Sequence, residues 1–111
     1  DLTMLGGHSS HSYINGTNMY FVYNYNINCE PKDEMILYHH PIQTIIVEET
    51  LKFGGSMCHH HGIGKYRNQW AKDEHGSAYY MLETLKQAFD PKGIMNYGCI
   101  FLPEDYKKFI R

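Results

Sequence analysis

The feature that most constrains the fold is an aromatic-rich stretch at residues 18–27, Asn-Met-Tyr-Phe-Val-Tyr-Asn-Tyr-Asn-Ile. Its period-two alternation, in residue types that favour extended backbone, predicts a β-strand. An Asn-Gly pair at 15–16 is typical of tight turns with positive φ, so residues 4–27 are predicted to form a β-hairpin. The odd-numbered face is apolar and is expected to pack on a core, whereas Tyr20 lies on the other, mixed face. The apolar face comprises Met19, Phe21, Tyr23, Tyr25 and Ile27.

Helical periodicity follows this hairpin. Apolar residues recur at helical spacing between residues 31 and 53, with Glu49 as the single polar interruption. Pro31 and the acidic residues after it are typical of a helix start, and Gly54 and Gly55 are expected to end the helix. Pro41 lacks a backbone donor, so we expect either a kink there or a second helix that begins at this residue.

The remaining segments complete an α+β pattern. We predict a short strand at residues 56–58, a short helix within 65–76, and a helix at 77–89 with Ser77 as its N-cap. Turn and extended chain are predicted at 92–102, and a last helical turn after residue 103. The expected fold class is therefore α+β: an antiparallel hairpin plus one further strand with covering helices.

Length and charge exclude several classes of protein. A chain of 111 residues suits one small domain, and a formal net charge of −2 with scattered Lys and Arg predicts no nucleic-acid footprint. No apolar run is long enough for a transmembrane segment, and the N-terminus does not resemble a signal peptide. Three distant cysteines predict reduced thiols and a cytoplasmic protein. Cys58 beside His59 is a poor nucleophile pair, because adjacent side chains on extended backbone point apart.

Three consecutive histidines, His59, His60 and His61, precede Gly62 and Gly64. A purification tag would sit at a terminus, and at most two adjacent imidazoles on extended chain can reach one metal ion. The alternative interpretation, a solvated loop without a functional role, stays open. The glycines favour a loop that closely approaches a backbone or a flat ligand, where imidazoles can donate hydrogen bonds or accept a proton.

The hairpin contains a second group of polar side chains, His8, His11, Tyr13 and Tyr20. A functional cluster and a solvent-exposed face of the sheet are equally consistent with it. Neither a dinucleotide-binding glycine motif nor a phosphate loop occurs, so the chain carries no nucleotide-binding loop of its own.

Two longer motifs carry a family resemblance. Gly-Gly-Ser-Met-Cys-His-His-His-Gly-Ile-Gly-Lys at 54–65, with Arg67 and Trp70 after it, precedes a helix and an Asp-Pro-x-x-Ile close at 90–94. The hairpin adds a pattern of Tyr13, Gly16, Tyr20 and Phe21. Over residues 8–100 the chain resembles the C-terminal region of FAD-linked oxidases of the vanillyl-alcohol oxidase type. The branch that it resembles most is alkyldihydroxyacetonephosphate synthase and its bacterial relatives.

The resemblance implies roles for particular residues. Tyr20 maps onto the catalytic acid/base of the family, and His60 and His61 map onto the functional pair of the loop in front of the flavin. His59, Gly62 and Gly64 are then cofactor-binding positions. A phenol has a free pKa near 10, and a neighbouring imidazolium would favour its ionised form. Lactate-oxidising relatives hold a metal with residues that are replaced here by Tyr20 and His60, which implies no metal.

The resemblance also implies a longer protein. The chain begins at Asp1 rather than at a methionine, and we interpret it as a C-terminal fragment: the end of the cap (substrate) domain at about 1–90, and a C-terminal tail at about 91–111. The implied cofactor is FAD, not expected in the fragment itself, and the implied partners are an upstream FAD-binding domain and a small-molecule substrate. A monomer and a homodimer both stay open. The alternative function is a non-enzymatic histidine-rich metal-binding or interaction module.

Overall fold

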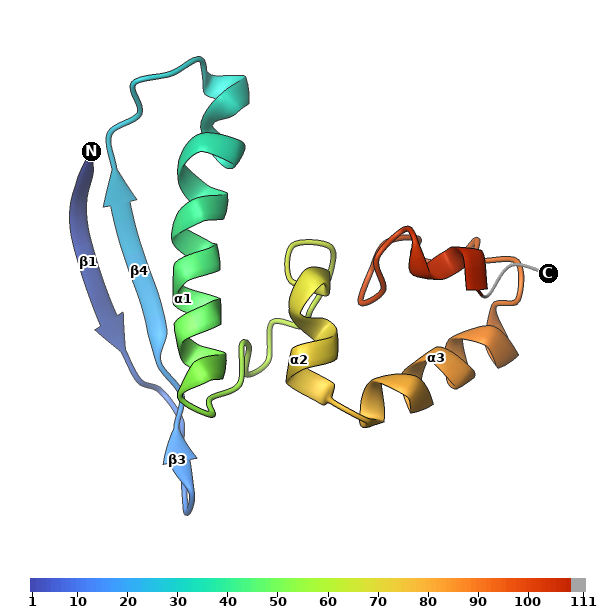
Figure 1. The fold of residues 1–111 in the computed structure, drawn as a ribbon. Helices are drawn as coiled ribbons and strands as arrows, with labels where there is room; N and C mark the ends of the chain where they lie inside the picture. Colours follow the sequence, from blue (N-terminus) through green and yellow to red (C-terminus); the bar gives the residue numbers. More distant parts are fainter. Residues whose placement is uncertain (109–111) are drawn as a thin grey trace. The chain divides into compact units, whose positions relative to one another are not determined.

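The computed structural model describes residues 1–108 and divides the chain into two compact units, Asp1–Glu48 and Glu49 onward. The first unit contains a β-ribbon and the first part of helix α1 (His40–Lys52), and Figure 1 shows α1 running beside the ribbon. The second unit contains helices α2 (Ala71–His75) and α3 (Ala78–Phe89). The α+β class predicted from the sequence is confirmed. No helix in the described part of the chain is long and apolar enough to cross a membrane.

The ribbon is an antiparallel pair of β1 (Leu2–His8) and β4 (Tyr20–Tyr25). A separate small pair, β2 (Ser12–Tyr13) and β3 (Gly16–Thr17), closes the connection between them. The predicted hairpin is confirmed, but the turn was placed wrongly. Its two central residues are Ile14 and Asn15, and neither Asn15 nor Gly16 has a positive φ. In a turn whose two central residues both have negative φ, glycine is favoured at the position that follows them, which Gly16 occupies here.

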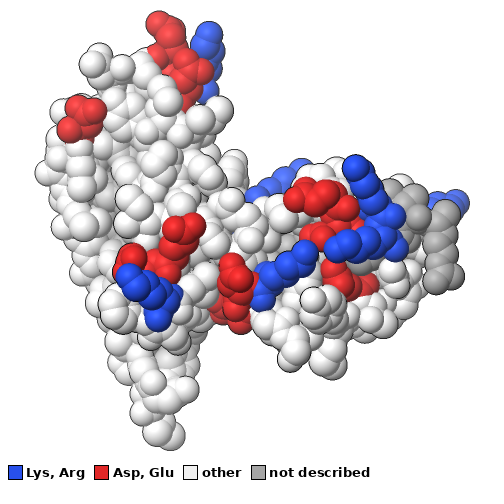
Figure 2. All heavy atoms as spheres, in the orientation of Figure 1, with Lys and Arg blue, Asp and Glu red and all other residues white. Residues whose placement is uncertain are grey.

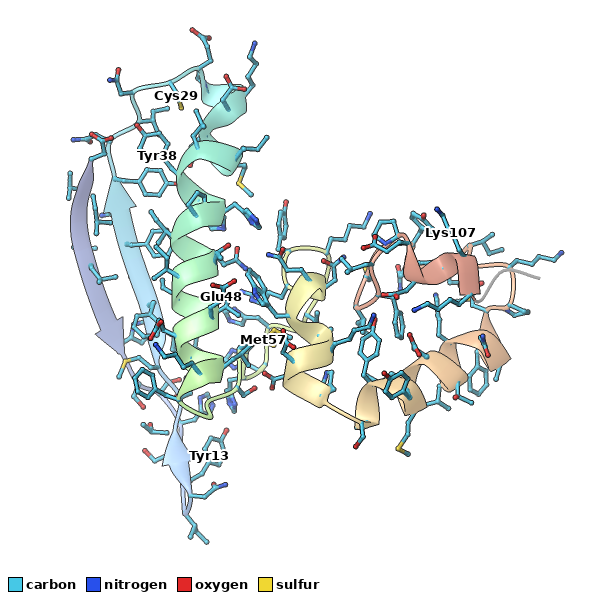
Figure 3. The ribbon with its side chains drawn as sticks, in the orientation of Figure 1. Tyr13, Cys29, Tyr38, Glu48, Met57 and Lys107 are labelled. Atoms are coloured by element: carbon cyan, nitrogen blue, oxygen red, sulfur yellow. The ribbon has the colours of Figure 1, made fainter. Side chains whose placement is uncertain are left out.

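The odd-numbered face of β4 packs on the helical segment, as predicted, but only at its second half. The Tyr23 hydroxyl lies 3.0 Å from His39 Nδ1, and the Tyr25 ring stacks on Tyr38 at 5.3 Å between centroids. Figure 3 shows Tyr38 between the helix and the ribbon. Phe21 and Met19 are about half exposed. The expectation of a continuous apolar contact from Met19 onward was therefore wrong, and hydroxyl and ring contacts dominate this interface.

The helical segment is interrupted next to Pro41, as expected. It begins as a 3-10 helix, Pro31–Asp33, continues as a π-helix, Met35–His39, and becomes α1 at His40. The backbone N–H of His40 donates to the carbonyl of Met35, five residues back. A proline ring collides with the carbonyl four residues before it in an α-helix. The wider π turn is the observed solution to this conflict.

The second unit has the better-defined core. Ala71 from α2, Tyr79 from α3, and Phe101 and Tyr106 from the C-terminal segment form one buried cluster. Asp105, only 2% exposed, accepts hydrogen bonds from Lys72 (3.2 Å), the Tyr79 hydroxyl (3.1 Å) and Lys108 (2.9 Å). Burial raises the pKa of Asp105, but these three donors outweigh burial, so the pKa lies below its usual range.

Two local predictions for the second unit need correction. Within the described range, residues 56–58 form no strand, because the Glu74 carboxylate accepts from Ser56 Oγ (2.5 Å) and from the Met57 N–H (2.9 Å). Ser77 precedes α3 but, in the described structure, makes no side-chain capping hydrogen bond.

The C-terminal segment differs in a similar way. Residues 92–102 are turns and bends rather than extended chain. The Asp90 carboxylate accepts from the N–H groups of Ile94 (3.0 Å) and Met95 (2.9 Å), which folds the chain back after α3. A final 3-10 helix, Asp105–Lys108, confirms the predicted last turn, and the rest of that prediction, 109–111, lies outside the described residues.

On the face drawn in Figure 2, Lys and Arg side chains lie among Asp and Glu side chains. On the same face, the described Lys and Arg residues form no continuous positive surface.

Candidate functional site

The histidine loop, residues 59–64, presents three imidazoles at the surface of the second unit. His59, His60 and His61 are all exposed. Their rings pack edge to face, with centroids 4.9 Å apart between His59 and His60 and 4.6 Å apart between His60 and His61. His59 and His60 each offer a ring nitrogen, and these two atoms lie within 4.8 Å of each other, so the loop itself brings two imidazole donors close together.

The backbone of the histidine loop requires its glycines. Gly62 and Gly64 have φ values of 75° and 59°, in the left-handed region that other residues rarely adopt. Arg67 Nη1 donates to the Gly62 carbonyl (3.3 Å), and the N–H of Ile100 donates to the Gly64 carbonyl (3.0 Å). The side chain between them, Ile63, packs against the core cluster. The loop is therefore anchored at both glycines while its histidines stay exposed.

The chain entering the histidine loop is fixed by α2. Glu74 holds Ser56 and Met57 through the two hydrogen bonds described above. Burial raises the pKa of the Cys58 thiol, an effect that nearby Arg67 opposes and Glu74 reinforces. A raised pKa keeps the sulfur protonated near neutral pH, so Cys58 lacks the thiolate that a nucleophile needs.

The chain leaving the loop is held just as firmly. Asn68 Nδ2 donates to the Gly98 carbonyl (2.8 Å), and Trp70 is buried at the start of α2. Arg67 and Trp70 both belong to the family motif. Arg67 anchors the loop backbone through its hydrogen bond to the Gly62 carbonyl, and Trp70 is a buried side chain.

Tyr20 lies at the first residue of β4, in the other unit. Regular pairing from Leu5–Tyr23 to His8–Tyr20 places it on the opposite face of the strand from Tyr23, as predicted. Its ring stacks on that of His8, with centroids 4.7 Å apart and planes 10° apart. Tyr20 is half-buried, whereas His8 is exposed.

The loop that leads into Tyr20 is closed by a polar network. Asn18 Oδ1 accepts from the N–H groups of His11 (2.7 Å) and Ser10 (3.1 Å), and the Asn18 N–H donates to the His11 carbonyl (3.1 Å). Thr17 Oγ1 donates to the same carbonyl (2.8 Å). His11 and Tyr13 of the predicted polar cluster both lie in this connection, and Figure 3 shows Tyr13 on its small β-pair. The network fixes where β4 begins.

The predicted site residues thus fall into two groups. His59, His60, His61, Gly62 and Gly64 form one loop of the second unit, and Tyr20 lies in the first unit. The roles that the family resemblance implies require Tyr20, His60 and His61 to converge on one surface, and this convergence stays a prediction.

Sequence reasoning placed His8 in one polar cluster with Tyr20 but did not predict that their rings stack. It missed two supporting residues: Asn18 as the acceptor that closes the loop, and Glu74 as the acceptor that orders residues 56–57. The strand register that brings His8 opposite Tyr20 does not follow from the small pair β2–β3. Extending the small pair Ser12–Thr17 without a slip would place Tyr20 opposite Ser9, but the ribbon pairs it with His8.

Comparison with known proteins decides the family. The family described as FAD linked oxidases, C-terminal domain, matches residues 2–100. The chain belongs to this family. The match includes the hairpin, the histidine loop and α3, which are the segments that carry the resemblance in the sequence.

Among its relatives, this FAD-linked oxidase C-terminal domain is 66% identical over 102 residues to the uncharacterized FAD-linked oxidoreductase YgcU of Escherichia coli O157:H7. It is 65% identical over the same length to the protein of that name from strain K12. It is 32% identical over 90 residues, 80% of the chain, to alkyldihydroxyacetonephosphate synthase of Dictyostelium discoideum.

Both YgcU matches cover 91% of the chain but only 21% of the relative, and the synthase match covers 14% of the relative. The chain therefore spans about a fifth or less of the length of these relatives. No solved structure matches this domain.

Proposed function

We propose that this domain forms the substrate side of the active site in an FAD-dependent oxidoreductase, with the histidine loop facing the flavin. The observation that carries the proposal is the loop itself. Three exposed imidazoles stand on a backbone that Arg67 and Ile100 anchor at Gly62 and Gly64, within a chain that matches the FAD-linked oxidase family. A rigid backbone with exposed ring donors suits the positioning of a substrate against a planar cofactor.

The described residues suit the flat ring system of FAD but not its pyrophosphate. A Cβ atom added at Gly62 or Gly64 would meet no other atom within 4 Å, so this surface of the loop is open to a flat ring system. The chain contains no glycine-rich phosphate loop for the pyrophosphate. When bound, FAD supplies the electron-accepting chemistry of the reaction. In the proposal, the adenine and pyrophosphate are held by an FAD-binding domain outside these 111 residues.

The proposed roles of the side chains follow from their chemistry. Tyr20 transfers a proton at its hydroxyl group, and His60 and His61 orient the substrate and accept or donate protons near neutral pH. His59 lines the flavin-facing surface, together with the backbone at Gly62 and Gly64. These roles require Tyr20 and the histidine loop to meet in the folded enzyme.

The proposed reaction is a net oxidation of a small hydroxy acid or alcohol. The higher identity to proteins named FAD-linked oxidoreductases supports this class over the exchange of an acyl for an alkyl group that the synthase relationship suggests. The two classes differ in a measurable way. An oxidation leaves the flavin reduced after one anaerobic turnover, whereas an exchange without net redox leaves it oxidised.

The test uses the full-length protein with FAD and a panel of 2-hydroxy acids, primary alcohols and acyl-dihydroxyacetone phosphate. Visible absorbance of the flavin reports reduction, and chromatography reports exchange. Tyr20→Phe should lower the turnover rate about 100-fold or more, because a positioned acid or base contributes about 10²–10⁴-fold, and FAD should stay bound. His61→Ala should have a similar effect.

Tyr80→Phe, which removes an exposed hydroxyl from α3, is the matched control and should retain full turnover. Normal turnover in Tyr20→Phe would reject the proton-transfer role. Stoichiometric zinc or nickel bound to the full-length protein, and lost in His60→Ala and His61→Ala, would instead favour the metal-binding alternative.

A further inference from the structure

The contact between His8 and Tyr20 joins two strands at their ends. His8 is the last residue of β1 and Tyr20 the first of β4, and the two are direct cross-strand partners. Cross-strand partners project from the same face of a ribbon, so their rings meet above it. The centroid distance of 4.7 Å and the interplanar angle of 10° describe a face-to-face stack rather than a chance edge contact.

A stack of this kind restricts what the phenol ring can do. A tyrosine ring on an exposed strand rotates about χ1 and χ2, and its hydroxyl moves with it. A second ring lying flat against it favours one ring plane, which fixes the line along which the hydroxyl points. A proton-transfer group must lie within hydrogen-bonding reach of its partner, and small misplacements are costly in rate.

Within the first unit, the His8 imidazole stacks on the Tyr20 ring from the neighbouring strand. Val22, the next residue on the same face of β4, is exposed and pairs with Gly6, which has no side chain to reach Tyr20. On the other side, Asn18 accepts hydrogen bonds from the N–H groups of Ser10 and His11, which order the backbone just before β4. The Asn18 network thus acts on the backbone before Tyr20, whereas the His8 stack acts on the Tyr20 ring itself.

We propose that His8 is a positioning residue for Tyr20, which holds the phenol ring in a catalytically productive orientation by stacking on it. The inference rests on the proposed function, because it assigns His8 a purpose only if Tyr20 transfers a proton. The property that matters is the flat ring, so a phenylalanine at position 8 should replace the histidine and an alanine should not.

Turnover in the full-length FAD protein tests this inference, with the panel compound that reduces the flavin fastest as the probe. His8→Phe should stay within about twofold of the parent. His8→Ala should fall about three- to tenfold, the range expected for loss of one aromatic stack. Val22→Ala, on the same face of the same strand, is the control and should have no effect. In a Tyr20→Phe background, His8→Ala should cause no further loss, because its effect passes through the phenol.

A spectroscopic measurement tests the stack independently of turnover. With 3-fluorotyrosine at position 20 of the full-length protein, the ¹⁹F resonance should carry a ring-current shift that His8→Phe retains and His8→Ala loses. An unchanged resonance in His8→Ala would overturn the inference. Equal losses of turnover in His8→Phe and His8→Ala, or an additive loss in the double variant, would also overturn it.

The two proposals fail differently. Normal turnover in Tyr20→Phe rejects the proposed function whatever the ¹⁹F result. Normal turnover in His8→Ala, with Tyr20→Phe inactive, rejects only the positioning role of His8.

Discussion

At the scale of single residues, Tyr25 shows how the first unit holds its ribbon against its helical segment. Its hydroxyl donates to Glu34 Oε1 at 2.5 Å, and its ring stacks on Tyr38. The hydrogen bond to Glu34, followed by burial and by the charge of that carboxylate, raises the pKa of Tyr25 to about 12. The interface therefore depends on a neutral phenol facing a charged acceptor.

The pH dependence of this contact has a definite sign. A folded-state pKa above the ordinary value of about 10 means that the contact stabilises the fold fully below about pH 10 and is lost as the pH rises through 12. Glu34→Gln removes the charge and should bring the pKa of Tyr25 back toward 10. NMR titration of ¹³C-labelled tyrosine measures it, with Glu48→Gln as the control. A Tyr25 pKa that stays near 12 in Glu34→Gln would contradict the assigned cause.

At the scale of elements, the sequence predicted those parts of the fold that local periodicity determines. The alternation at 18–27 predicted β4, and helical spacing predicted α1 and α3. Pro41 predicted an interruption because its missing donor is a local property. These are features that a residue imposes on its immediate neighbours, and they needed no knowledge of the tertiary structure.

The predictions that failed depended on partners outside the predicted segment. Residues 56–58 were predicted to form a strand. Instead, Ser56 Oγ and the Met57 N–H donate hydrogen bonds to the carboxylate of Glu74, which lies eighteen residues beyond Ser56. Residues 92–102 were predicted to include extended chain, but the Asp90 carboxylate accepts from the N–H groups of Ile94 and Met95 and folds the chain into turns. For the candidate site, the sequence named the histidine loop, Tyr20, His8 and Arg67, but it did not predict the contacts among them, because those contacts carry no periodic signal.

Glu74→Ala provides a test at this scale. Loss of the carboxylate leaves the Met57 N–H without its acceptor, so its hydrogen-exchange rate should rise about tenfold, as expected for one charge-assisted hydrogen bond. Turnover of the full-length enzyme should fall while FAD stays bound, because the chain entering the histidine loop loses its anchor. Asp73→Ala, one residue earlier on α2, should change neither property. An unaltered exchange rate at Met57 would show that the loop is held by other contacts.

At the scale of the whole molecule, helix α3 carries several large apolar side chains that are exposed. On α3, Met81, Leu85 and Phe89 are 69%, 53% and 81% exposed, although their spacing forms a stripe along one side of the helix. Contiguous exposed apolar side chains mark surfaces that other protein covers. This stripe is consistent with the proposal that the domain works as part of a longer enzyme, as the length of its relatives suggests.

The isolated 111-residue chain should therefore fail to retain FAD. It offers a loop that suits the front of the flavin ring but no phosphate-binding loop, and ring contacts alone leave most of the cofactor in water. Purification of the chain alone should yield protein without flavin absorbance, whereas the full-length protein purified in parallel should be yellow. Flavin that co-purifies with the isolated chain at near-equal stoichiometry would contradict this expectation.

The π-helix at Met35–His39 has a consequence for the history of the sequence. A turn closed by a bond five residues back contains one residue more than an α turn, so this segment is one residue longer than a regular helix needs. Deleting Ile36 alone would restore α geometry and drive the Pro41 ring into a carbonyl. The extra residue and the proline should thus be gained or lost together among homologues: a one-residue gap in this helix should coincide with a different residue at position 41.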